Sequence, residues 1–169
     1  MNPTLLALIT CGAAAAAEGV LAGGGVRQRL AQLRMPPYSP PFPLWLAIGA
    51  LYYAMCFVVL RHLLAIRPFT PVLFVALALL VTVLLVNALW SVLFFRWRDL
   101  RASFVAFIPY AILVAALVVL LIWLYPFGAA LFACYCIYLL FATWWGYHLW
   151  RLNTPTPNQA MQPTAGTAR

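Results

Sequence analysis

Residues 69–95 read FTPVLFVALALLVTVLLVNALWSVLFF, a stretch of 27 residues without a charged side chain. An α-helix needs about 20 mainly apolar residues to cross the hydrocarbon core of a bilayer, which is about 30 Å thick. This stretch is long enough to do so, and Arg96 follows it directly. The sequence therefore predicts a membrane-spanning helix here.

The composition of the whole chain agrees with this prediction. Of its 169 residues, 67% are hydrophobic and only 7% are charged, whereas soluble domains have roughly 45–50% and about 25%. So few charges would not cover the surface of a soluble domain, and so many apolar residues exclude a disordered chain. Four cysteines are too few for a disulfide-stapled secreted module. We therefore expect an integral membrane protein.

Four further apolar stretches have membrane-spanning length. The uncharged stretch 102–150 is too long for one helix, and Pro126 with Gly128 is expected to divide it. A cleaved signal peptide is the alternative for the first stretch, although residues 1–4 lack the basic residue that such a peptide carries. The expected fold is an all-α bundle of five transmembrane helices in a domain of residues 1–152, followed by a disordered polar tail at 153–169. The expected spans are 3–22, 44–64, 69–95, 102–124 and 127–150.

The charged residues indicate topology. All ten basic residues are Arg, and the net charge is +8. The arginines lie between the apolar stretches and form no single stripe with aromatic residues, so we expect the lipid bilayer as a partner and no nucleic acid. Eight arginines fall on one side of the membrane and two on the other, which places the N-terminus outside and the C-terminus in the cytoplasm. The eight are Arg27, Arg29, Arg34, Arg96, Arg98, Arg101, Arg151 and Arg169, and the two are Arg61 and Arg67.

The connection between the first two spans is long and rich in proline. Val26, Leu30 and Leu33 have the spacing of a short amphipathic helix at the membrane surface. Five prolines then fall within eight residues from Pro36 onward. Proline fixes the backbone φ angle and stiffens a loop. The segment is therefore either a stiff linker or a lid over a cavity, and its spacing alone leaves both open.

Two helix faces combine aromatic and polar side chains. The third span carries Asn87, Trp90, Ser91 and Phe94 on one face, and the last span carries Tyr135, Tyr138, Ala142, Trp145 and Leu149. An amide within hydrocarbon is costly unless it faces another helix or a polar ligand group. The faces therefore predict either aromatic packing between helices or the walls of an apolar small-molecule cavity.

Few other residues suggest chemistry. Glu18 is the one acid within an expected span, where it either serves as a proton or cation site or reaches interfacial water. His62 and His148 lie near span ends, as interfacial histidines do. Cys134 and Cys136 point about 200° apart on a helix and cannot bind one metal together. We therefore expect no metal, no required cofactor and no catalytic residue, and the protein is not expected to be an enzyme.

The chain resembles the TspO/MBR family, which includes the translocator protein, tryptophan-rich sensory proteins and the peripheral benzodiazepine receptor. The family's Lys-Pro-x-Trp-x-Pro-Pro segment resembles Met35-Pro-Pro-Tyr-Ser-Pro-Pro41, and its Leu-Tyr pair followed by Met resembles Leu51-Tyr52-Tyr-Ala-Met55. The pattern of its third span resembles Val86-Asn87-Ala-Leu-Trp90-Ser-Val-Leu-Phe94-Phe95. The pattern of its last span resembles Tyr135-Cys-Ile-Tyr138-Leu-Leu-Phe-Ala142 and Trp150-Arg-Leu-Asn153.

Several family positions differ in this chain. A glutamine before the third-span Asn is Val83, and the tryptophan before the Leu-Tyr pair is Ile48, although Trp45 is near. Tyrosine replaces tryptophan at Tyr38 and Tyr138, while Cys134 and Gly146 replace a proline and an asparagine. The sterol-recognition pattern is not met around Tyr147 and Arg151. The chain is therefore similar to a divergent, bacterial-type member, for which tetrapyrroles are better supported as ligands than sterols.

The resemblance implies five helices around a pocket that the first loop closes, usually in a homodimer in a bacterial membrane, here the inner membrane. The implied ligands are porphyrins and other hydrophobic molecules, which would be transported, sensed or broken down in light. The alternatives are a proton-coupled exporter of lipophilic cations that uses Glu18, or a structural membrane partner without a ligand. The resemblance and the two helix faces together give the expected ligand-binding residues, which are Tyr38, Pro40, Pro41, Trp45, Leu51, Tyr52, Asn87, Trp90, Phe94, Tyr135, Tyr138, Ala142 and Trp145.

Overall fold

The computed structural model describes residues 2–154, and every regular element in that range is helical. Five helices are long and apolar enough to cross a membrane, so the expected all-helical, five-span fold is confirmed. Their ends lie within three residues of the expected span limits. The tail expected at 153–169 lies outside the described residues from residue 155 onward. The five helical spans are Pro3–Ala22, Phe42–Ala65, Pro71–Arg96, Leu100–Leu124 and Pro126–Asn153.

Two of these spans are built from more than one element. The third consists of α4 (Pro71–Ser91) and the π-helical turn η1 (Val92–Arg96), and the fourth of α5 (Leu100–Val105) and α6 (Phe107–Leu124). The other spans are the single helices α1 (Pro3–Ala22), α3 (Phe42–Ala65) and α7 (Pro126–Asn153), and the short helix α2 (Val26–Ala31) lies between α1 and α3. In η1 the Trp97 amide donates to the Val92 carbonyl over 2.9 Å. Such turns are often found at functional sites.

Local sequence explains where the helices begin. Proline occupies the first turn of α1, α3, α4 and α7, where its missing N–H costs no helical hydrogen bond. The side chains of Asn2, Thr70 and Asp99 accept hydrogen bonds from the amides of Thr4, Leu73 and Ala102, as N-cap residues do. Pro126 begins α7 directly after the end of α6, so the expected division of the stretch 102–150 is present.

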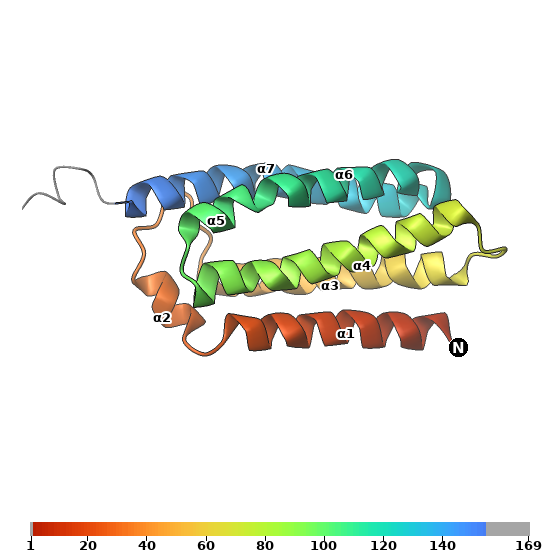
Figure 1. Ribbon diagram of the computed structural model, residues 1–169, viewed down its shortest axis with the longest axis horizontal. Helices are drawn as coiled ribbons and strands as arrows, with labels where there is room; N and C mark the ends of the chain where they lie inside the picture. The colour runs from red at the N-terminus through yellow and green to blue at the C-terminus, as the bar shows by residue number, and fades with distance from the viewer. Residues whose placement is uncertain (1, 155–169) are drawn as a thin grey trace, which may run out of the picture.

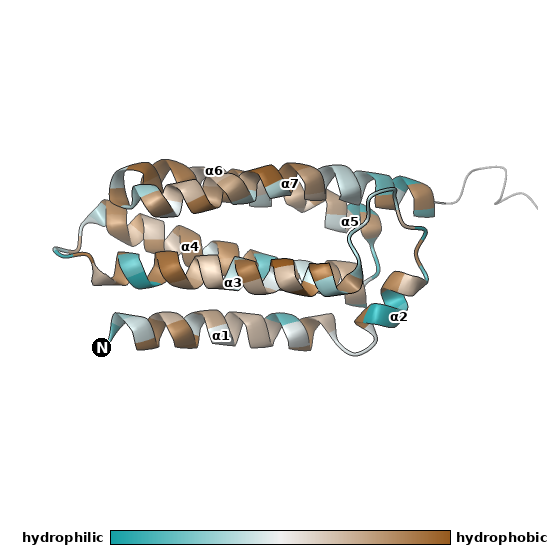
Figure 2. Cartoon of the chain, turned by 180° about the vertical axis from the view of Figure 1, so that it is seen from behind, coloured by the Kyte–Doolittle hydropathy of each residue, from teal (hydrophilic) through white to brown (hydrophobic). Residues whose placement is uncertain are grey.

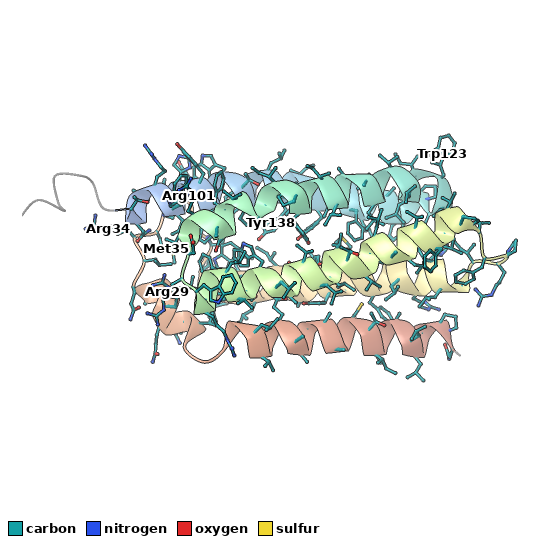
Figure 3. All side chains as sticks on the ribbon, viewed as in Figure 1. Arg29, Arg34, Met35, Arg101, Trp123 and Tyr138 are labelled. Atoms are coloured by element: carbon teal, nitrogen blue, oxygen red, sulfur yellow. The ribbon has the colours of Figure 1, made fainter. Side chains whose placement is uncertain are left out.

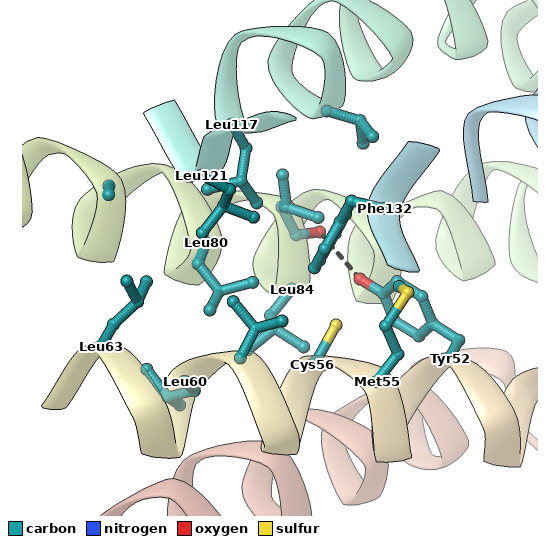
Figure 4. Close-up of a cluster of buried hydrophobic side chains, with 14 of the residues drawn as sticks. Tyr52, Met55, Cys56, Leu60, Leu63, Leu80, Leu84, Leu117, Leu121 and Phe132 are labelled. Atoms are coloured by element: carbon teal, nitrogen blue, oxygen red, sulfur yellow. Dashed lines mark hydrogen bonds between the residues drawn. The ribbon is translucent and has the colours of Figure 1, made fainter. Parts of the chain in front are cut away.

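The helices form three tiers (Figure 1). α6 and α7 pack as one pair, α3 and α4 lie beside them, and α1 packs on α3 and α4 at the far side. The core lies mainly between the two pairs, where Figure 4 shows leucines of α3, α4 and α6 around Phe132 of α7. The outer faces of the helices are also mostly hydrophobic (Figure 2), as expected of surfaces that face lipid.

Arginines gather at the end of the bundle where α2 lies. Seven of the nine described arginines belong to segments at this end, and only Arg61 and Arg67 belong to the opposite end. Figure 3 labels Arg29, Arg34 and Arg101 at this end and Trp123 at the other. We call it the arginine-rich end.

Candidate functional site

A cavity of about 470 Å³ lies between the α3–α4 pair and the α6–α7 pair, toward the arginine-rich end, and residues of α1 and η1 complete its lining. Its volume falls within the range of about 300–1,000 Å³ that is typical of small-molecule sites. Most of its walls are aromatic or aliphatic. The lining residues are Glu18, Trp45, Ile48, Gly49, Tyr52, Val86, Asn87, Leu89, Trp90, Val92, Leu93, Trp97, Ala106, Phe107, Tyr110, Tyr135, Tyr138, Leu139, Ala142 and Trp145.

Both helix faces identified in the sequence contribute to this cavity. Residues 87 and 90 lie on its α4 wall, and four residues of the other face lie on its α7 wall. The helical period explains this, because residues three or four positions apart stack on one side of a helix. The structure thus places eight of the expected ligand-binding residues around one cavity: Trp45, Tyr52, Asn87, Trp90, Tyr135, Tyr138, Ala142 and Trp145.

The other expected residues lie elsewhere. Phe94 is buried behind the wall and stacks on Trp90 with ring centroids 4.9 Å apart. Leu51 is 71% exposed on the outside of α3, and Tyr38 is 86% exposed. Pro40 and Pro41 precede α3, outside the lining of the cavity. Leu51 and the three loop residues, Tyr38, Pro40 and Pro41, were expected as ligand-binding residues from the resemblance alone.

Contacts with neighbouring segments hold three tryptophans of the cavity, Trp45, Trp90 and Trp145, in place. The Trp90 indole Nε1 donates to the Ser103 carbonyl over 3.0 Å. Trp45 of α3 and Trp145 of α7 face each other with ring centroids 5.0 Å apart. Indole N–H groups inside proteins usually find a hydrogen-bond acceptor, as that of Trp90 does. The aromatic faces therefore have fixed orientations before any ligand arrives.

Polar groups are few and form two clusters. In the first, the Glu18 carboxylate oxygen Oε2 accepts hydrogen bonds from Tyr53 Oη over 2.6 Å and from Asn87 Nδ2 over 3.1 Å. Glu18 lies on the cavity wall, so its carboxylate is tied to α3 and α4. Asn87 therefore has an interhelical partner and lines the cavity at the same time.

The second cluster consists of three tyrosine hydroxyls. Tyr110 Oη lies 3.0 Å from Tyr135 Oη and donates to Tyr52 Oη over 3.4 Å, and Tyr52 donates to the Val83 carbonyl over 3.4 Å. The cluster joins α3, α4, α6 and α7 at the inner end of the cavity. With its protons used in these bonds, the cluster can accept a hydrogen bond from a ligand that reaches it.

Residues 32–41 are tied to α7 at two points. The Ser39 hydroxyl accepts a hydrogen bond from Trp145 Nε1 over 2.9 Å and donates to the Pro36 carbonyl over 2.7 Å. Asn153 exchanges two hydrogen bonds with the Arg34 backbone, at 2.9 and 3.0 Å. Leu30 and Leu33 pack against the buried cluster that contains Phe94 and Trp145. α2 and the segment after it therefore cover the arginine-rich end of the aromatic wall.

The cavity is open on the side of α4 and η1. Leu89 and Trp97 line it, yet they are 57% and 70% exposed. Both lie on a lipid-facing part of a span or at its end. A hydrophobic molecule could therefore reach the cavity sideways from the bilayer.

Several residues that line the cavity were not predicted from the sequence, nor were the hydrogen bonds of Ser39 and Asn153 that tie residues 32–41 to α7. Ile48, Gly49 and Phe107 carry no signal that separates them from ordinary apolar residues. Tyr110 could have been noticed as a hydroxyl within an otherwise apolar span. Ser39 and Asn153 act through contacts 106 and 119 residues away along the chain, and no local pattern reports such contacts.

The histidines and cysteines lie apart from the cavity lining. His62 stacks on Tyr125 with ring centroids 3.7 Å apart, at the end opposite to the arginine-rich end. His148 Nδ1 lies 2.8 Å from the Trp144 carbonyl. Within residues 2–154, no three side chains of His, Cys, Asp or Glu are grouped so that they could hold a metal ion.

Comparison with protein families identifies a relationship for most of the chain. The model of the TspO/MBR family matches residues 6–151, which include all five spans apart from a few terminal residues. A comparison with curated proteins finds no match.

Proposed function

The chain belongs to the TspO/MBR family, and from this premise we propose that it binds planar hydrophobic ligands, above all tetrapyrroles such as porphyrins and haem intermediates. The ligand would lie in the cavity beneath residues 32–41, and the protein would act as a translocator or a sensor. The observation that carries the proposal is the preorganised aromatic wall of a cavity of about 470 Å³. A conjugated ring system gains stacking energy on such walls.

The polar groups of the cavity support a tetrapyrrole more than a purely apolar ligand. The pyrrole N–H groups of a free porphyrin can donate to the Glu18 carboxylate, which Tyr53 and Asn87 hold at the wall. The carboxylates of the porphyrin rim would point toward the open side, where Arg96 precedes Trp97 in the chain. We also propose that the protein is a homodimer of the bacterial inner membrane with its arginine-rich end in the cytoplasm.

Quenching of tryptophan fluorescence by protoporphyrin IX tests the proposal. Ala142 is buried on the cavity wall, whereas Leu140 is 73% exposed on the same helix. Ala142→Phe should raise the dissociation constant about tenfold, because an extra ring in a filled site costs about 1–3 kcal/mol. Leu140→Phe adds a ring outside the cavity and should leave the constant unchanged. Equal affinities for the two variants would contradict binding in this cavity.

A second function is favoured by the position of Glu18. Both of its hydrogen bonds end on Oε2, so Oε1 can accept a proton or face a cation. We therefore keep a proton-coupled exporter of lipophilic cations as the second candidate. In proteoliposomes with tetraphenylphosphonium as the probe, Glu18→Gln should abolish cation-dependent proton movement, while Asp99→Asn should leave it intact. Normal proton movement in Glu18→Gln would rule this function out.

A further inference from the structure

A small polar groove lies outside the main cavity, where α2 meets the end of η1. It has a volume of about 120 Å³ and is lined by Gly24, Gly25, Gln28, Arg29, Gln32 and Arg98, among others. Figure 3 labels Arg29 where α2 approaches the end of α4. The groove is about a quarter as large as the main cavity, so it suits a small polar group and not a ring system.

Arg29 brings an unpaired donor into this groove. Its Nε atom is inaccessible to solvent and has no hydrogen-bond partner among the described residues. A buried charged donor without a partner is costly, and most such groups in proteins are paired. A group bound in the groove could supply the missing partner.

The charges around the groove are all positive. Burial, and then the nearby charge of Arg98, lower the pKa of the Arg29 guanidinium from its usual value, although arginine stays protonated. The two acidic side chains are engaged elsewhere, because Glu18 binds Tyr53 and Asn87 and Asp99 caps α5. An external anion would therefore relieve the repulsion between Arg29 and Arg98.

We propose that this groove binds a phosphate group, held by the guanidinium groups of Arg29 and Arg98 and by the side-chain amides of Gln28 and Gln32. Guanidinium groups match phosphate oxygens with paired hydrogen bonds. The groove lies at the ends of α1 and η1 at the arginine-rich end, where we expect the spans to meet lipid headgroups. Anionic phospholipids present phosphate there without a neutralising headgroup cation, and a soluble phosphate is the other source. This site does not depend on the proposed function.

The test uses the purified full-length chain in phosphatidylcholine nanodiscs and measures binding of phosphatidylglycerol by native mass spectrometry. Arg29→Gln and Arg98→Gln should each weaken binding about tenfold, because each removes a charge-assisted contact with phosphate. Arg27 is exposed on the same helix but lies outside the groove, so Arg27→Gln is the matched control. It should change the affinity less than about twofold.

A second arm identifies the source of the phosphate. Inorganic phosphate, added as the probe for a soluble anion, should neither raise the melting temperature nor compete if the site takes a lipid. The other supporting outcome is a site for a soluble ligand. In that case inorganic phosphate would stabilise the wild-type protein but not Arg29→Gln, and the protein would show no preference for phosphatidylglycerol. Unchanged binding of both probes in Arg29→Gln and Arg98→Gln, or an equal loss in Arg27→Gln, would overturn the proposal.

A further pair of variants covers the case in which Arg29→Gln does not fold. Arg29→Lys keeps the positive charge but removes the planar group that pairs with two phosphate oxygens. It should weaken phosphatidylglycerol binding several-fold, whereas Arg27→Lys should not. Wild-type affinity in Arg29→Lys would contradict a built phosphate site and indicate unspecific attraction to charge.

Discussion

At the scale of single residues, Gly128 shows how closely the helices approach one another. A Cβ atom at this position would overlap the Tyr125 ring and lie 3.1 Å from Val59 Cγ2. The Tyr125 ring stacks on His62 and has little freedom to move away. Gly128→Ala should therefore destabilise the protein by about 1–3 kcal/mol and lower the melting temperature in detergent by roughly 2–10 °C.

The matched control for this prediction is Gly12→Ala. Gly12 lies in α1, and a Cβ atom added there would have no neighbouring atom within 4 Å, so the extra methyl group meets open space. Alanine is also the better helix former. A melting temperature that falls equally in both variants would show that the tight contact at Gly128 does not govern stability.

The residues of the candidate site differ in how well their positions follow from the sequence. Asn87 and Trp90, and likewise Tyr138 and Ala142, repeat at helical spacing, so their shared faces follow from the period of the α-helix. The spacing did not decide whether these faces pack together or enclose a cavity, because that depends on how far apart two helices lie. Leu51 came from the resemblance, and its exposure shows that it lies outside the cavity lining.

At the scale of elements, residues 32–41 behave as a strap that is fastened to α7. Its fastening at Asn153 consists of two hydrogen bonds with the Arg34 backbone. Asn153→Ala should loosen the strap, because each bond contributes about 1 kcal/mol. Hydrogen–deuterium exchange should rise in residues 32–41 but not in α6, and porphyrin should dissociate several-fold faster.

Thr154→Ala serves as the control for the strap. Its hydroxyl bonds only to the Trp150 carbonyl of its own helix, over 2.9 Å, so its loss should leave residues 32–41 unchanged. If Thr154→Ala raised hydrogen–deuterium exchange in residues 32–41 as much as Asn153→Ala does, fraying of α7 would be the cause. The strap would then not depend on the hydrogen bonds between Asn153 and Arg34.

The five spans themselves could be predicted because each is a long, mainly apolar stretch with at most one charged residue inside its expected limits. The division at Pro126 followed from the geometry of proline. The π-helical turn at Val92–Arg96 and the short helix Leu100–Val105 could not be predicted. The third and fourth spans meet at the hydrogen bond between Trp90 and Ser103, and no periodicity in the sequence predicts this contact.

At the scale of the whole molecule, the asymmetry of charge predicts one orientation in the membrane. The segments at the arginine-rich end carry seven of the nine described arginines, and such segments stay in the cytoplasm. In a variant without native cysteines, Phe69→Cys should react with a membrane-impermeant maleimide in intact cells. Gln32→Cys should react only after the cells are permeabilised.

The two cysteines make the orientation test decisive, because both positions are exposed and lie at opposite ends of the same bundle. As a control for local burial, the reagent should label both cysteines equally in the detergent-solubilised protein. If only Gln32→Cys were labelled in intact cells, the protein would have the opposite orientation, with its arginine-rich end outside. The phosphate groove would then face the outer leaflet, and the strap would cover the cavity from outside the cell.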